Sequence, residues 1–377
     1  MSIYLDYQAT TPVDPRVLAA MQPYWDTHFG NPHSQHRSGW QAAAAVDLAR
    51  ENVATLVGAP AEWCIFTSGA TEANNLALKG AMEAAPQGRR RLVTLATEHS
   101  CVLESARALE ARGFDLTILP VESDGLIDLT ILQDALDEDV ALVSVMAVNN
   151  EIGVIQPLKQ IGGLAKAAGA LFHSDAAQAF GRMPIDTNDL GIDLLSISAH
   201  KIYGPKGVGA LLIRPGMSLS PQMHGGGQEG RGLRSGTLPP ALLAGLGAAA
   251  KLASEQMKED ADHSRRLWDL MLGRLPQPFQ VNGSIVHRWY GNLNIAFPGI
   301  DGSRLLSDLR GLMISSGAAC ASAAGRKSHV LQAIGTDPAL ARASLRIGWG
   351  RFTTEEDIEE ASTMIAEAVQ AQRKMAA

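Results

Sequence analysis

The chain has 377 residues and a formal net charge of −7, and 46% of its residues are hydrophobic although only 5% are aromatic. This length predicts two domains, or one large α/β domain with an appendage, and the mainly aliphatic apolar residues suit helices packed on a parallel sheet. The negative charge argues against nucleic acid or an anionic membrane as the main partner. No apolar run is long enough for a bilayer, no signal peptide is recognisable, and three cysteines without metal-type spacing predict a reduced, cytoplasmic protein.

The first part of the chain alternates strand-like apolar runs with helical segments. A short N-terminal strand, a helix at 15–23, a loop at 27–39 and a helix at 41–57 closed by Gly58 are expected first. Further strands are expected at 63–66, 91–97, 114–119, 141–148, 170–173, 193–197 and 208–213, with helices at 76–84, 102–112 and 158–168. This alternation predicts a largely parallel sheet with helices on both faces.

The remaining chain is organised around a long helix that begins at residue 241 and becomes more charged toward residue 274. A glycine-rich, basic loop at 222–237 precedes it and is expected to contact a ligand or a partner subunit. After it, a smaller α+β arrangement contains the segment 315–325, which has no large side chain and carries Cys320. We place the domain boundary in the long helix, which predicts a large domain of residues 14–256 and a small domain of residues 1–13 and 257–377.

Polar side chains recur where successive predicted strands end, a position at which α/β sheets bind ligands. They are Thr71, His99, Asn150, Asp175, Gln178 and Lys201. Taken alone, each has an ordinary interpretation: Thr71 and His99 as helix caps, and Lys201 as a solvated loop residue. Because several coincide at one predicted edge of the sheet, we interpret them as a site.

The chemistry of these residues suits a cofactor with a phosphate, an aldehyde and a pyridine nitrogen. The turn and helix start at Gly69 and Thr71 form an anion-binding cup, in which backbone N–H groups and the helix dipole point at one spot. A partly desolvated Lys201 can form a Schiff base with the aldehyde. Asp175 can keep the ring nitrogen protonated, and Arg346 can bind a substrate carboxylate through two parallel hydrogen bonds. This combination predicts a pyridoxal 5′-phosphate (PLP) site, whereas the lack of a glycine fingerprint excludes a nicotinamide dehydrogenase.

The chain resembles the class-V aminotransferase-like cysteine desulfurases, of the group that serves iron–sulfur-cluster and nitrogenase assembly. The motifs that carry the resemblance run in order over nearly the whole length: YLDYQATTP, FGNPHS, FTSGATEANNLALKG, TEH, VNNEIG, HSDAAQ, SAHKIYGPKGVGAL, HGGGQE, RSGT, SSGAACAS and LRIGWGRFTTEE. The resemblance implies PLP-dependent transferase fold type I, with a mainly parallel seven-stranded sheet in the large domain and a smaller α+β domain.

The resemblance also implies a role for each site residue. Lys201 would be the Schiff-base lysine, His99 would stack on the ring and move protons, and Cys320 would be the nucleophile. The ring contacts would be Asp175 and Gln178. The phosphate would be bound by Ala70, Thr71, Ser198, His200 and, from the neighbouring subunit of a homodimer, Thr237. The substrate carboxylate would be oriented by Asn150 and Arg346.

The implied reaction converts L-cysteine to L-alanine and leaves the sulfur on Cys320 as a persulfide for an acceptor protein. After Cys320 the chain departs from the Leu-Glu-Pro stretch usual in members that feed cluster scaffolds, so the acceptor stays open between iron–sulfur-cluster assembly and thiolation. Cys101 is a second thiol, interpreted as a packing residue. The alternatives are a selenocysteine lyase, another class-V PLP aminotransferase, and a non-catalytic scaffold that retained the fold.

Overall fold

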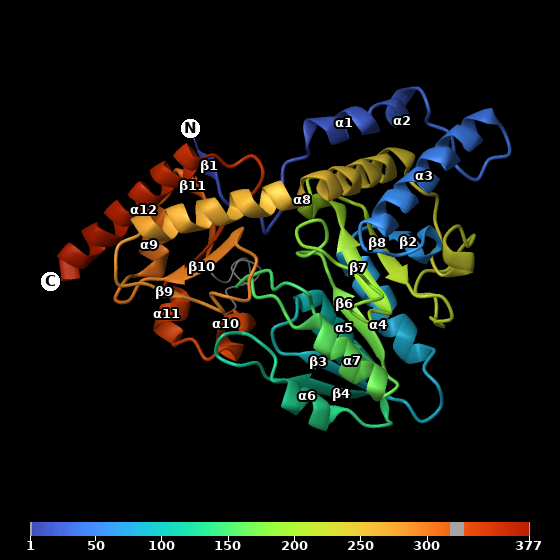
Figure 1. Ribbon diagram of the computed structural model, residues 1–377, viewed down its shortest axis with the longest axis horizontal. Helices are drawn as coiled ribbons and strands as arrows, with labels where there is room; N and C mark the ends of the chain where they lie inside the picture. Colours follow the sequence, from blue (N-terminus) through green and yellow to red (C-terminus); the bar gives the residue numbers. More distant parts are fainter. Residues whose placement is uncertain (1, 317–327, 377) are drawn as a thin grey trace.

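A computed structural model describes residues 2–316 and 328–376 of the chain (Figure 1). Cys320 therefore lies outside the described residues. The N-terminal half of the chain forms a large layered unit, and the C-terminal third forms a smaller unit beside it. None of the helices within the described ranges is long and apolar enough to cross a membrane.

The large unit is built on a seven-stranded sheet with the strand order β2-β8-β7-β6-β5-β3-β4. Its strands are β2 (Cys64–Thr67), β3 (Arg91–Leu95), β4 (Asp115–Leu119), β5 (Val140–Ser144), β6 (Leu171–Asp175), β7 (Leu194–Ser198) and β8 (Gly209–Ile213). All neighbours from β7 to β4 are parallel, whereas β8 runs antiparallel to both β7 and β2. The largely parallel, seven-stranded sheet expected from the sequence is thus confirmed.

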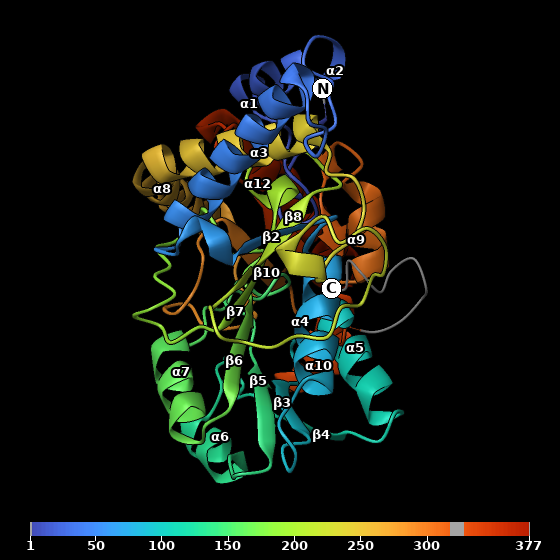
Figure 2. The same ribbon diagram turned by 90° about the vertical axis from the view of Figure 1, so that its right-hand side faces the viewer.

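Helices cover both faces of this sheet, as the side view shows (Figure 2). On one face, α4 (Ala70–Glu83) and α5 (Ser100–Glu110) pack against Leu92 and Leu194. On the other face, α3 (Arg37–Thr55), α6 (Leu129–Ala135) and α7 (Leu158–Ala167) share a core with the next residue of each strand, Val93 and Leu195. Successive side chains of a strand point to opposite faces, so a strand covered on both sides reads as a continuous apolar run.

The smaller unit has its own core. Its four-stranded sheet has the order β12-β13-β10-β9, and a separate strand pair joins β1 to β11. The elements are β1 (Ile3–Tyr4), β9 (Gln280–Val281), β10 (Asn292–Ala296), β11 (Leu312–Met313), β12 (Ser315–Ser316), β13 (Ser344–Gly348), α9 (Gly302–Asp308), α10 (His329–Ala333), α11 (Pro338–Arg342) and α12 (Glu355–Ala376). Ile3 and Leu5 are buried in this core, so the N-terminus packs with the C-terminal third of the chain.

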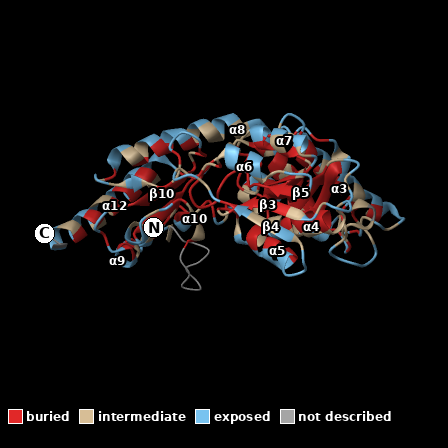
Figure 3. Cartoon of the chain, turned by 90° about the horizontal axis from the view of Figure 1, so that it is seen from below, coloured by how far each residue is buried: buried red, intermediate tan, exposed pale blue. Residues whose placement is uncertain are grey.

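A 35-residue helix, α8 (Pro240–Arg274), connects the two units (Figure 1). Its first half contributes Leu243 and Leu246 to the core of the large unit, and its second half contributes Leu267 and Met271 to the core of the smaller one. The burial-coloured view shows buried residues concentrated in the sheet layer and exposed residues along the outside of α8 (Figure 3). The helix therefore fixes where the smaller unit lies against the end of the large sheet.

Two short helices precede α3, namely α1 (Pro15–Met21) and α2 (Pro23–Asp26), where the sequence had predicted one helix. The second begins at Pro23, because a proline is tolerated in the first turn of a helix but not in its interior. The helix expected from residue 76 begins six residues earlier, at Ala70. This difference places Thr71 in the first turn of α4, next to the cavity described below.

Candidate active site

A cavity of about 750 Å³ lies at the carboxyl ends of the parallel strands, between the large sheet and the smaller unit. Ten of the predicted site residues line it: Ala70, Thr71, His99, Asn150, Asp175, Gln178, Ser198, His200, Lys201 and Arg346. The two other predicted residues have no place in this lining as described. Thr237 is exposed elsewhere on the chain, and Cys320 lies outside the described residues.

One end of the cavity is formed by the first turn of α4. Gly69 precedes this helix with φ +148°, a conformation that favours glycine. A Cβ added at Gly209 on β8 would meet the Gly69 Cα at 2.8 Å, so a glycine there allows the strand and the turn to approach. The first backbone N–H groups of a helix have no partner in the helix itself, and Thr71 adds a hydroxyl beside them. The turn therefore suits an anionic group such as a phosphate.

Lys201 ends a single 3-10 turn (Ala199–Lys201) that directly follows β7. Its ammonium donates hydrogen bonds to the backbone oxygens of Gln8 and of Ala9, the latter at 2.8 Å. Thr10 Oγ1 lies 3.1 Å from Nδ1 of His200, whose pKa is lowered to about 4 by burial and then by the nearby positive charge of Lys201. The N-terminal segment therefore forms one wall of the site.

The Asp175 carboxylate is held at the end of β6. Its Oδ1 accepts the backbone N–H of Ala177 at 2.9 Å, and its Oδ2 accepts Nδ2 of Asn74 at 2.7 Å. Asn74 is fully buried on α4. Both oxygens are thus fixed by donors, while the carboxylate itself lines the cavity.

His99 is the N-cap of α5, and its Nδ1 accepts the backbone N–H of Cys101 at 3.2 Å. A backbone N–H is always a donor, so Nδ1 carries no proton and the neutral ring holds its proton on Nε2. Burial lowers the pKa of His99, with the charge of Lys201 acting in the same direction. The Cys101 sulfur lies 3.0 Å from Nδ1 and 3.1 Å from Asn74 Nδ2, which links His99 to the Asp175 network.

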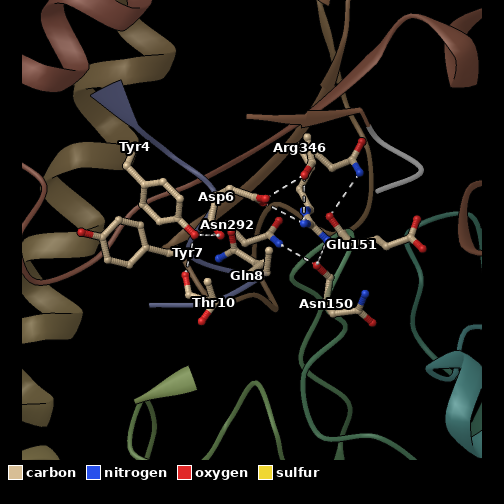
Figure 4. A network of polar contacts seen from close by, with 12 residues as sticks. Tyr4, Asp6, Tyr7, Gln8, Thr10, Asn150, Glu151, Asn292 and Arg346 are labelled. Atoms are coloured by element: carbon tan, nitrogen blue, oxygen red, sulfur yellow. Dashed lines mark hydrogen bonds and ion pairs between the residues drawn. The ribbon is translucent and has the colours of Figure 1, made fainter. Parts of the chain in front are cut away.

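Arg346 on β13 also lines the cavity, and its side chain points toward Asp6 (Figure 4). Its Nη2 donates to Asp6 Oδ1 at 2.8 Å, and Nη1 reaches the backbone oxygen of Asn150 at 3.4 Å. The buried Nε has no hydrogen-bond partner among the described residues. Asp6 also accepts Ser315 Oγ at 2.9 Å. The guanidinium is therefore oriented by one carboxylate and retains donor capacity for an anionic ligand.

Sequence reasoning missed the part played by the N-terminal segment and by Asn74. The stretch YLDYQATTP was noticed only as a motif, although Asp6, Gln8 and Thr10 line the cavity. Nothing in the local pattern shows that residues 6–10 cross from the smaller unit to Lys201, some 190 positions away along the chain. The importance of Asn74 could have been predicted from the sequence, because a polar residue on the buried face of a helix needs a buried hydrogen-bond partner.

The sequence profile of the family described as Aminotransferase class-V matches residues 3–360. The chain belongs to this family. It is 50% identical over 371 residues to the protein named cysteine desulfurase IscS from Rickettsia bellii (strain OSU 85-389), which covers 97% of this chain and 90% of that protein. This class-V chain also superposes on a solved structure described as a NifS-like protein with a TM-score of 0.92 and 36% identity, over 98% of this chain and 100% of that one.

A further solved structure, described as SspA in complex with cysteine, matches this class-V chain with a TM-score of 0.85 and 37% identity over 94% of this chain and 100% of that one. Enzymes of this class depend on PLP, and the cavity fits that cofactor. A glycine turn at a helix start suits the phosphate, a lysine amine suits the aldehyde, and a carboxylate suits the ring nitrogen. All three lie around one cavity large enough for a small cofactor.

Proposed function

We propose that this chain is a cysteine desulfurase that converts L-cysteine to L-alanine and passes the sulfur to an acceptor protein. The observation that carries the proposal is the convergence, in one cavity, of an amine, a carboxylate and an anion-binding helix start with a buried arginine. The similarity to proteins named cysteine desulfurase along nearly the whole chain supports it.

The cofactor would be held at three points. Ala70, Thr71, Ser198 and His200 would bind its phosphate, and Asp175 and Gln178 its ring. When bound, PLP supplies an electron-withdrawing ring that stabilises negative charge on the α-carbon of an amino acid. Lys201 would supply the amine that holds the cofactor's aldehyde, and once the amine of L-cysteine has displaced it, its free Nζ would take the α-proton of the substrate.

The remaining residues would bind the substrate and move its proton. Arg346 would bind the carboxylate of L-cysteine through the donor capacity that its contact with Asp6 leaves, and Asn150 would lie beside it. His99 would stack on the ring and carry a proton on Nε2, the nitrogen that its helix-capping contact leaves protonated. Because its pKa is lowered, it would act as a neutral imidazole near neutral pH.

Sulfur transfer would involve Cys320. Its thiolate attacks the sulfur of the substrate, so that a sulfur–sulfur bond forms while the carbon–sulfur bond breaks. The electron pair of that bond stays with carbon, which is protonated to give alanine. In the balanced net reaction, L-cysteine and the Cys320 thiol yield L-alanine and a Cys320 persulfide. The acceptor would then take the outer sulfur for iron–sulfur-cluster assembly or thiolation.

We also propose that the chain acts as a cytoplasmic homodimer, with Thr237 of each subunit completing the phosphate site of the other. Large apolar side chains are exposed on the first three helices and the loop between α2 and α3. They are Leu18, Trp25, Phe29, Trp40 and Leu48. A group of large apolar side chains on one region of a surface is typical of an interface. A dimer would bury these side chains and explain why Thr237 is exposed in the single chain.

The decisive experiment measures alanine and sulfide from L-cysteine, with a reductant present, in the wild type and in Cys320→Ala. Equal amounts of the two products from the wild type, and loss of both in the variant with its bound cofactor retained, would establish the proposed reaction. Bound PLP without any alanine would instead favour another class-V aminotransferase. Much faster turnover of selenocysteine than of cysteine would favour the selenocysteine lyase.

A further inference from the structure

Arg182 is a buried cation immediately behind the cavity wall, in the turn that follows β6. Only 9% of the residue is exposed. Burial lowers its pKa to about 10, which still leaves the guanidinium charged at neutral pH. Among the described residues, no carboxylate lies within ion-pair distance of it. A buried charge without an opposite charge is expensive, so a specific use for its hydrogen bonds is expected.

The guanidinium of Arg182 contacts both Gln178, proposed to bind the cofactor ring, and the backbone of Lys201, proposed to bind its aldehyde. Nη1 donates to Oε1 of Gln178 at 2.5 Å, and Nη2 donates to the backbone oxygen of Lys201 at 2.9 Å. Nη2 also reaches the backbone oxygen of Tyr7 at 3.4 Å. Arg182 therefore connects three parts of the chain by hydrogen bonds: the turn after β6, the turn after β7 that contains Lys201, and the N-terminal segment.

These contacts determine which way the Gln178 amide faces. The oxygen and nitrogen of an amide are nearly identical in shape, so their assignment rests on their partners. A guanidinium can only donate, and it therefore requires the carbonyl oxygen of Gln178 on its side. The amide nitrogen must then point away from Arg182. Nε2 donates one hydrogen to the backbone oxygen of Gln8, which lies 3.0 Å from it, and the other hydrogen is left for the cavity that Gln178 lines.

We propose that Arg182 is a positioning residue for the reaction, which fixes the Gln178 amide so that it presents an N–H donor, and not its carbonyl, to the ring oxygen of PLP. The inference rests on the proposed function, since it assumes that this cavity binds PLP. Arg182 does not touch the cavity itself, and its effect is exerted through Gln178. Without it, of these two contacts only the one with the Gln8 backbone oxygen still orients the amide, and an amide that turns its oxygen toward the ring oxygen replaces an attraction by a repulsion.

The test is a double-mutant cycle on the PLP-loaded protein, made of Arg182→Met, Gln178→Ala and both together. The readouts are the wavelength and pH midpoint of the visible band of the bound cofactor, and the dissociation constant of PLP. We expect each single change to weaken PLP binding about tenfold and to shift the band alike, because each removes one oriented hydrogen bond. Because both act through one amide, the double variant should be no worse than Gln178→Ala alone.

Three further variants make the cycle specific. Gln178→Glu keeps an oxygen for Arg182 but has no N–H, and its second oxygen would face the ring oxygen, so it should shift the band at least as far as Gln178→Ala does. Arg182→Lys keeps a donor and should recover most of the wild-type band. If Arg182→Met does not fold, Arg182→Leu, which also removes the donor to Gln178, takes its place in the cycle. Arg288→Met removes another buried arginine bonded to backbone oxygens, those of Ser284, Ile152 and Asn292, and should lower stability without moving the band.

The outcomes separate this inference from the proposed function. An unchanged band in Arg182→Met, or effects of Arg182→Met and Gln178→Ala that simply add, would overturn the positioning role while wild-type alanine production stands. A wild-type protein that binds no PLP would remove the proposed function and the inference with it. One that binds PLP but makes no alanine from L-cysteine would remove the proposed function alone.

Discussion

Arg346 is almost fully buried, with 3% of its side chain exposed, and its nearest charged group is the Asp6 carboxylate. A lysine at this position would keep the charge but lose the planar, two-pronged geometry that matches a carboxylate. We therefore expect Arg346→Lys to raise the KM for L-cysteine by about tenfold or more, because the substitution removes roughly one charge-assisted hydrogen bond to the substrate carboxylate. Steady-state kinetics of alanine formation measure this. The exposed Arg342→Lys is the control, and an unchanged KM in Arg346→Lys would show that the carboxylate binds elsewhere.

Among the described residues two lysines line the cavity, Lys201 and Lys206, and the ammonium of Lys201 is held by the backbone oxygens of Gln8 and Ala9. We expect Lys201→Ala to abolish the visible band of protein-bound PLP, because within residues 2–316 and 328–376 no other amine occupies its place at the end of β7. Lys206→Ala should retain that band. Absorption spectra after incubation with PLP and gel filtration compare the two. A wild-type spectrum in Lys201→Ala would contradict the assignment.

At the scale of elements, the central strands of the sheet are connected through one fully buried histidine. His173 on β6 lies 2.8 Å from Ser144 Oγ on β5 through Nδ1 and 3.0 Å from Ser196 Oγ on β7 through Nε2. Burial lowers its pKa to about 3. An unfolded histidine titrates near 6.5, so between about pH 6.5 and 3 the unfolded chain binds more protons than the folded one. This contribution to stability is present above pH 6.5 and is lost as the pH falls.

We accordingly expect the free energy of unfolding to fall by about 1.4 kcal/mol between pH 7.5 and 5.5 through His173 alone. In His173→Gln, which retains polar contacts but does not titrate, this decrement should disappear. Urea unfolding at the two pH values measures it, with the exposed His287→Gln as the matched control. An equally steep pH dependence in His173→Gln would mean that other groups, such as His200, cause the loss.

At the scale of the whole molecule, the exposed apolar side chains of α1 to α3 are the surface on which we expect a second copy to dock. Trp25 is 60% exposed and Trp40 is 64% exposed. Replacing both with glutamate should shift the protein toward the monomer, because a buried carboxylate at an interface has no partner. Sedimentation velocity measures the shift. Val286→Glu, at a residue that is 67% exposed in the loop before β10, should leave the association state unchanged.

A dimer that also completes the site has a second consequence. The Trp25→Glu and Trp40→Glu protein should bind PLP more weakly at low protein concentration, since Thr237 of the neighbouring subunit would be missing from the phosphate site. Wild-type PLP affinity in a demonstrated monomer would show that Thr237 is not required. The division into a large domain of residues 14–256 and a small domain of the remainder stays a prediction, although α8 contributes to two separate cores.

The sequence by itself determined most strands and helices of the large unit, the largely parallel sheet, and ten of the residues around the cavity. Alternating and continuous apolar runs are local patterns that predict where strands lie. Polar residues that directly follow such runs, such as Asp175 and Lys201, are therefore predicted to lie at strand ends. The prediction that these residues gather at one edge required only the general geometry of parallel strands.

Only the tertiary structure decided what surrounds those residues. Asp6 meets Arg346 across 340 positions, and Gln8 meets Lys201 across 193, because the N-terminal strand packs in the smaller unit and its continuation crosses the site. The tautomer of His99 depends on its capping contact, and the direction of the Gln178 amide depends on Arg182. Such contacts follow from how distant segments pack against each other, and no local pattern in the chain specifies that packing.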